Sequence, residues 1–130
     1  MNVEYPIFAY EQDDHSMWLI ENEERIFYHL EEADIINGEY VFWDARGGGV
    51  SIHISKKGEM TAPSAAPAAF PITEALARYA RAKDVDLGDA AGSPVEIWER
   101  IQEELRRRRK PDGVVIRILR RFAGRSRGID

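Results

Sequence analysis

The sequence predicts an α+β fold: a mostly antiparallel sheet of five or six strands within residues 3–55, packed on one face by two or three C-terminal helices. The first half carries short runs of β-branched and aromatic residues separated by turn residues. The second half instead carries apolar residues at helical spacing. Because 130 residues is close to the usual size of one domain, we expect the whole chain to form a single domain.

Four segments in the first 36 residues have the composition of strands: residues 3–10, 17–20, 25–30 and 33–36. Pro6 has no N–H to donate to a neighbouring strand, so the first segment is expected at the edge of the sheet or with a bulge. The sequence therefore predicts an acidic β meander that occupies residues 1–55.

Asn37 and Gly38 give the strongest turn signal, since both tolerate the positive φ of a two-residue type I′ turn. They predict a hairpin between residues 33–36 and residues 39–44. The glycines at 47–49 then turn the chain into residues 50–55, whose alternating apolar and polar positions predict one more strand.

Residues 56–70 are rich in alanine and proline and are expected to link the sheet to the helices. Residues 71–83 carry a one-sided apolar stripe and predict a helix. A second helix is expected after Ser93, where Pro94 and Glu96 complete a capping box.

Pro111 is expected to end that second helix, and Asp112 to begin a last one that reaches residue 123. For residues 114–122 a strand is the competing prediction, because VVIRI is also β-prone. Residues 71–123 would thus form a basic helical segment, followed by a flexible tail over residues 124–130.

Charge is divided unevenly along the chain, whose formal net charge is −5. Residues 1–62 hold 13 acidic and 4 basic side chains, whereas residues 63–130 hold 10 acidic and 14 basic ones. A fold that keeps the two halves apart would present surfaces of opposite sign, and such surfaces attract oppositely charged partners.

The candidate acidic surface gathers around the predicted Asn37-Gly38 hairpin and comprises Glu31, Glu32, Asp34, Glu39 and Asp44. Carboxylates in this number can stand in for a phosphate backbone and block a basic active site, as an inhibitor or immunity-type protein does. The alternative is an exposed sheet face that charge keeps soluble.

The candidate basic strip would bind phosphate or an acidic partner through Arg106, Arg107, Arg108, Arg109, Lys110, Arg117, Arg120 and Arg121. The alternative is a solvated helix end. Glu103 and Glu104 stand four residues before Arg107 and Arg108, which is favourable for ion pairs within a helix. Cations also complement the dipole at a helix C-terminus.

Composition and spacing argue against several classes of site. The chain has no cysteine, and its three histidines show no metal-binding spacing, so neither a metal nor a cofactor is expected. Ser51 or Ser55 with His53 and Asp44 would supply the residue types of a hydrolase, but no nucleophile elbow surrounds them. An enzyme is therefore disfavoured.

The sequence favours a small protein-interaction module that acts through charge-polarised surfaces, either as an inhibitor or as a homodimer. The alternative function is a nucleic-acid accessory protein that contacts phosphates through the arginine-rich segment. The first residues lack the features of a secretory signal, and no stretch approaches the roughly 18 apolar residues that span a bilayer. A cytoplasmic location without membrane association is the expectation.

Overall fold

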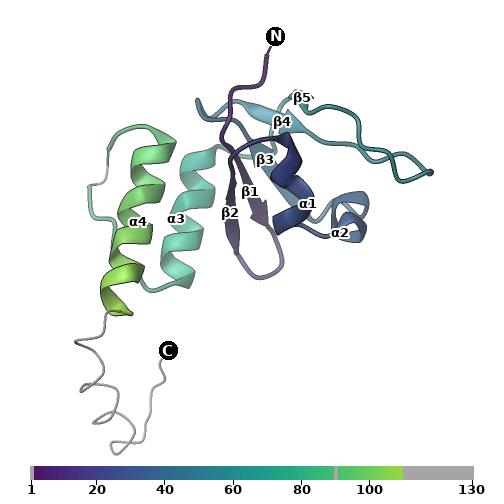
Figure 1. Ribbon diagram of the computed structural model, residues 1–130. Coiled ribbons are helices and arrows are strands. Elements are labelled where there is room, and N and C mark those ends of the chain that lie inside the picture. Colours follow the sequence, from purple (N-terminus) through teal and green to yellow (C-terminus); the bar gives the residue numbers. More distant parts are fainter. Residues whose placement is uncertain (1, 90, 110–130) are drawn as a thin grey trace, which may run out of the picture.

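The computed structural model describes residues 2–89 and 91–109 and contains a five-stranded antiparallel sheet together with helices (Figure 1). The predicted α+β class is confirmed. The strands are β1 (Ile7–Glu11), β2 (Met17–Ile20), β3 (Tyr40–Trp43), β4 (Gly49–Ser51) and β5 (Ser64–Ala65). The helices are the 3-10 turn η1 (Glu23–Arg25) and α1 (Ile26–His29), α2 (Glu32–Ile36), α3 (Ile72–Ala82) and α4 (Pro94–Arg108).

The strands lie side by side in the order β2-β1-β3-β4-β5. In β1, Phe8 is opposite Leu19 of β2 and Trp43 of β3. β1 is therefore an interior strand and not the edge strand that Pro6 suggested. Pro6 lies just before the strand begins, where no ladder hydrogen bond is required of it.

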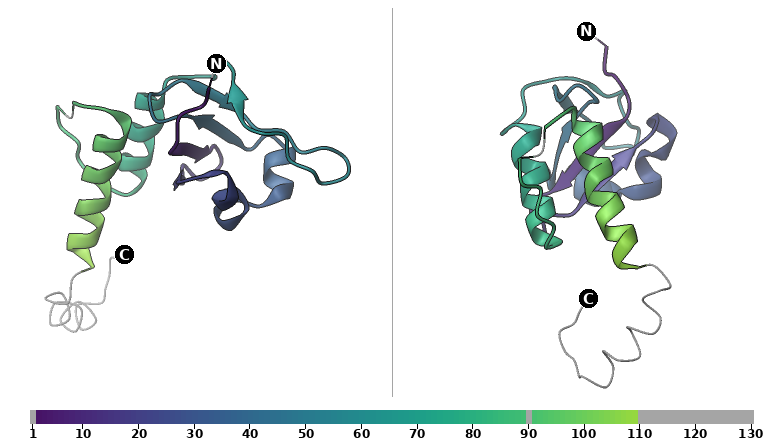
Figure 2. Two further views of the ribbon diagram at one scale, coloured as in Figure 1. Left: turned by 45° about the horizontal axis from the view of Figure 1, so that its top comes forward. Right: turned by 90° about the vertical axis from the view of Figure 1, so that its left-hand side faces the viewer.

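Alternation along β1 divides the core into two clusters, one on each face of the sheet. Phe8 and Tyr10 join a cluster with side chains of α3 and α4, such as Leu76 and Ile101. Ile7 and Ala9, which point the other way, join a second cluster with Ile26, Leu30 and Ile35 of α1 and α2. The sheet thus carries helices on both faces rather than on one, as Figure 2 also shows.

The strands predicted at 25–30 and 33–36 were wrong, since these residues form α1 and α2. Asn37 and Gly38 end a helix instead of turning a hairpin. The N–H of Asn37 donates to Ala33 O at 3.0 Å, and Gly38 follows with a φ of +71°. A left-handed glycine is as typical of a helix C-terminus as of a type I′ turn. The dipeptide alone therefore could not separate the two structures.

The sheet also ends differently from the prediction. β4 stops at Ser51, and Ile54 makes only an isolated bridge to Met60. The fifth strand, β5, lies within the expected linker and pairs antiparallel to β4. Its two residues are exposed and carry no apolar alternation, so the sequence offered no strand signal there.

The helices α3 and α4 confirm the predictions for residues 71–83 and for the helix after Ser93. The hydroxyl of Ser93 accepts from the N–H of Glu96 at 3.2 Å, and the Glu96 carboxylate accepts from the N–H of Ser93 at 2.8 Å. The last predicted helix, from Asp112 to residue 123, lies outside the described residues. Within the part of the chain that the structure describes, no helix is both long and apolar enough to cross a membrane.

Candidate functional site

The most distinctive exposed surface lies on the two short helices α1 and α2. Ile26, Leu30 and Ile35 anchor these helices by burying their side chains against the sheet. Phe27, Tyr28 and Ile36 point away and remain 47%, 73% and 57% exposed. They are the large hydrophobic side chains that residues 2–89 and 91–109 leave exposed. We call these three residues, with the exposed Glu23, Glu24, Glu31 and Glu32, the α1–α2 surface.

The four glutamates of the α1–α2 surface, Glu23, Glu24, Glu31 and Glu32, have no ion-pair partner among the described side chains. The nearby cation Arg25 lies over the ring of Tyr28, 4.8 Å from its centroid. The surface therefore combines apolar side chains with a net negative charge that the fold leaves unbalanced.

Two predicted acidic residues, Asp34 and Glu39, meet a third that the sequence did not single out. One carboxylate oxygen from each of Glu11, Asp34 and Glu39 lies within 4.8 Å of the others, and we call these residues the carboxylate trio. Glu11 reaches this position because it pairs with Tyr40 across β1 and β3. Strand register of this kind cannot be read from sequence spacing.

Partial burial and repulsion between carboxylates change the protonation of two members of the trio, Glu11 and Glu39. Burial is the main cause that raises the pKa of Glu11 and that of Glu39. Repulsion from neighbouring carboxylates, among them Asp34, raises both pKa values further. The same two causes raise the pKa of Tyr40 to about 12. Three carboxylates would suit a hard cation, but exposed acidic groups often gather without one, so the trio alone identifies no ligand.

The substitution Asp34→Asn is expected to lower the pKa of both Glu11 and Glu39, because it removes a repulsive charge from each. A carboxyl with a raised folded pKa holds its proton longer than in the unfolded chain, so the free energy of unfolding falls as pH rises through that pKa. Asp34→Asn should lessen this fall. NMR titration of the glutamate carboxyls measures the first effect, and urea unfolding on either side of the transition measures the second.

The matched control is Asp86→Asn, which makes the same change on the loop after α3. It should leave the pKa of Glu11 and Glu39 unaltered, since Asp86 contributes to neither. Unchanged glutamate titrations in Asp34→Asn would contradict the role given to Asp34.

Asp44, the fifth residue of the predicted acidic surface, lies apart from this exposed group and is only 9% exposed. Its Oδ1 accepts from the N–H groups of Arg46 and Gly48, both at 3.0 Å, and its Oδ2 accepts from the N–H of Glu4 at 3.2 Å. The carboxylate is thus engaged by the backbone of the β3–β4 turn and of the N-terminal segment.

The arginines of the predicted basic strip that lie on α4 are paired within the helix. Arg106 contacts Glu103 at 2.8 Å, and Arg107 and Arg108 both pair with Glu104. Arg108 also donates to Lys83 O at 2.8 Å and to Asp84 O at 2.6 Å. Its guanidinium therefore satisfies carbonyls at the C-terminal end of α3. These contacts match the helix-end alternative. Arg109 is the C-cap residue of α4 and is exposed. The other four strip residues, Lys110, Arg117, Arg120 and Arg121, lie outside the described residues.

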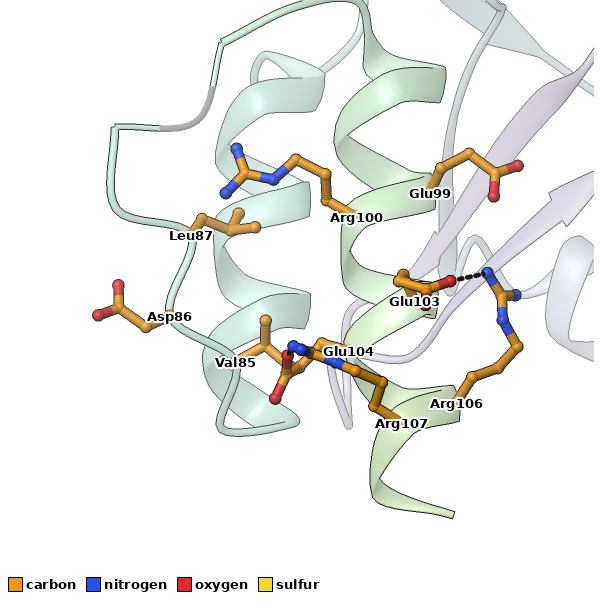
Figure 3. Close-up of a pocket in the computed structure, with 9 residues that line it drawn as sticks. All are labelled: Val85, Asp86, Leu87, Glu99, Arg100, Glu103, Glu104, Arg106 and Arg107. Carbon is orange, nitrogen blue, oxygen red and sulfur yellow. Dashed lines mark hydrogen bonds and ion pairs between the residues drawn. The ribbon is translucent and has the colours of Figure 1, made fainter. Parts of the chain in front are cut away.

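Arg106 and Arg107 line an open pocket of about 460 Å³ between α4 and the loop that follows α3 (Figure 3). Glu99, Glu103 and Glu104 line the same pocket, and Arg100 lies on its other side. Asp86 on the loop lines it as well, so four carboxylates and three guanidinium groups surround the pocket. This mixture gives the pocket no excess of positive charge with which to bind a phosphate.

The residues of the hydrolase considered above come together only in part. The hydroxyl of Ser51 lies 2.7 Å from Nε2 of His53, and both side chains point to solvent. Within residues 2–89 and 91–109, no third side chain is hydrogen-bonded to His53, and Asp44 is held by its own turn. The pair thus lacks the group that orients the base in a catalytic triad.

Comparisons of the chain with protein-family models, curated protein sequences and solved structures found no match.

Proposed function

We propose that the chain is a small protein-interaction module that binds a basic partner protein through the α1–α2 surface. The observation that carries this proposal is the position of three exposed large hydrophobic side chains among unpaired carboxylates on two consecutive helices. Phe27, Tyr28 and Ile36 would form the centre of the interface, and the glutamates its rim.

Phe27, Tyr28 and Ile36 are all exposed on two consecutive helices. Single exposed apolar residues are ordinary, whereas groups of them mark interaction sites. Tyr28 is also of a residue type that concentrates binding energy in protein interfaces, and Arg25 holds its ring from one side. A polar rim around an aromatic centre is the usual arrangement of such interfaces.

The charge of the surface indicates the chemistry of the partner. Residues 21–39 contain seven carboxylates and one arginine, Arg25. Electrostatic complementarity accelerates association and selects the partner, so the surface favours a protein with a basic patch. The carboxylates would take the place of phosphates on such a patch, which makes inhibition of a phosphate-binding protein the natural consequence.

A separate protein suits this surface better than a second copy of the chain. A symmetric dimer through α1 and α2 would bring like charges together, which is unfavourable. The arginines of α4 from another copy are already paired with Glu103 and Glu104. A homodimer would instead appear as self-association of the purified chain.

The test measures affinity for the basic protein that the purified chain recovers from extract of its native cells. Glu31→Lys combined with Glu32→Lys is expected to weaken binding about a hundredfold, because like charges would then face the partner. Tyr28→Ala should weaken binding about thirtyfold or more by removing an anchoring ring. Calorimetry gives the dissociation constants, and light scattering reports any self-association.

The matched control combines Asp89→Lys with Glu99→Lys, which changes the net charge equally at exposed positions outside α1 and α2. Its affinity should stay within about threefold of the unmodified protein, since remote charges act only weakly through solvent. Equal losses in the two double variants would mean that net charge alone governs binding. Loss in neither, or self-association that Tyr28→Ala abolishes, would also refute the proposal.

A further inference from the structure

A second candidate site lies between the β1–β2 turn and α3, on the face of the sheet opposite the α1–α2 surface. It is a pocket of about 240 Å³ lined by His15 from the turn and by Arg78, Arg81 and Ala82 from α3. Typical sites for drug-sized ligands begin at roughly 300 Å³, so this pocket suits a small group or ion.

His15 is held in an uncommon conformation that brings its ring to the pocket. Its φ is +62°, in the left-handed region that residues other than glycine seldom adopt. The N–H of His15 donates to Glu11 O at 3.0 Å, and its ring Nδ1 is hydrogen-bonded to the hydroxyl of Tyr10. Backbone outliers of this kind cluster at binding and active sites.

Tyr10 interacts with both His15 and Arg78. Tyr10 is fully buried, and a hydrogen bond to it is the main cause that raises the pKa of Arg78. The hydroxyl of Tyr10 engages Nδ1 of His15, so Nε2 is the ring nitrogen that can donate to a ligand in the pocket.

The two arginines contribute differently. Arg78 is fixed, because it pairs with Glu74 and lies 4.5 Å from the centroid of the Phe70 ring. Arg81 is exposed and has no ion-pair partner among the described side chains, so its charge is available. The polar side chains that line the pocket thus offer donors and positive charge. The carboxylate of α3, Glu74, is already bound to Arg78, and Asp13 and Asp14, which precede His15 in the turn, do not line the pocket.

We infer that the pocket of His15, Arg78 and Arg81 binds a phosphate group, either as inorganic phosphate or as a small phosphate monoester. A doubly charged tetrahedral oxyanion suits a pocket lined by several donors, and guanidinium groups bind phosphate with paired, charge-assisted hydrogen bonds. This site is independent of the α1–α2 surface, so either proposal can fail without the other.

NMR titration of the isotope-labelled chain tests the inference, with inorganic phosphate, ethyl phosphate and acetate added at constant ionic strength. Saturable shifts are expected at His15, Arg81 and Ala82 with both phosphates. Arg81→Gln should weaken phosphate binding at least about tenfold, as expected for loss of a hydrogen bond to a charged group. His15→Gly should also weaken binding while preserving the turn, because glycine adopts positive φ readily.

Arg100→Gln is the matched control, since it removes the same charge from α4 outside this pocket. Its affinity should remain within about twofold of the unmodified protein. If inorganic phosphate binds and ethyl phosphate does not, the inference holds and the ligand is the free ion. Absence of saturable shifts, equal affinity for acetate, or equal weakening by Arg100→Gln and Arg81→Gln would each overturn it.

Discussion

Gly49→Ala is expected to lower the free energy of unfolding by about 3 kcal/mol, because no space exists for a methyl group at this position. A Cβ on Gly49 would lie 2.1 Å from Ala66 O and 2.6 Å from Ala68 N. Both neighbours are backbone atoms, which cannot rotate away as a flexible side chain does. Residues 66–68 would have to move, and the hydrogen bond from Ala66 N to Gly49 O at 3.0 Å would be lost.

The displacement would extend into the core beneath α3. The carbonyl of Phe70 accepts from Trp43 Nε1 at 3.0 Å, and the Phe70 ring packs edge-on against the rings of Tyr10 and Trp43. A movement of residues 66–68 would displace Phe70 and disturb its contacts with these two rings. Because protein interiors are close-packed, a shift there loses contacts on several sides at once.

Gly48→Ala is the control, as it adds the same methyl group one residue earlier. Its Cβ would meet Asp44 Oδ1 at 3.5 Å, an ordinary contact, and its φ lies outside the left-handed region. The change in unfolding free energy should stay within about 0.5 kcal/mol. Urea unfolding followed by tryptophan fluorescence and circular dichroism measures both variants. If Gly49→Ala behaves like Gly48→Ala, the close approach of residues 66–68 to β4 is wrong.

The same glycine shows why part of the sheet could not be predicted. β5 pairs with β4, and the residues that follow β5 pass against the backbone of Gly49. These contacts join segments that share no sequence pattern. The helix that begins after Ser93 was predictable, since its capping box lies within four residues. Local signals therefore located α3 and α4, whereas long-range strand pairing needed the folded chain.

The α1–α2 surface was likewise predictable only in part. Charge along the sequence drew attention to Glu31, Glu32 and Asp34, but not to the exposed side chains of Phe27 and Tyr28 beside them. Those rings fell in a segment predicted as a strand, where one face of aromatics would be buried. As a short helix, the segment buries Ile26 and Leu30 and leaves the rings outside. The hydrophobic part of the surface thus depended on the secondary structure assigned to residues 25–36.

Asp44→Ala is expected to lower the free energy of unfolding by about 3 kcal/mol, because three backbone N–H groups lose a charged acceptor in a nearly buried position. Asp44→Asn should cost about half as much. Its Oδ1 still accepts from Arg46 and Gly48, but its amide nitrogen would face the N–H of Glu4 as a second donor. Urea unfolding measures both.

Arg46→Ala separates the contribution of the Asp44 carboxylate from that of the neighbouring Arg46–Glu4 ion pair. Arg46 contacts Glu4 at 2.6 Å, yet its side chain is 81% exposed, so the pair should contribute less than about 1 kcal/mol. A loss in Arg46→Ala equal to that in Asp44→Ala would mean that the ion pair, and not the Asp44 carboxylate, joins the N-terminal segment to the turn.

Asp44→Asn also decides whether this residue belongs to the surface that binds the proposed partner. Its carboxylate is committed to three backbone N–H groups and is 9% exposed, so a partner gains little from its charge. Affinity for the partner should therefore remain within about twofold at temperatures where the variant is folded. A loss as large as that of Glu31→Lys with Glu32→Lys would extend the interface to the β3–β4 turn.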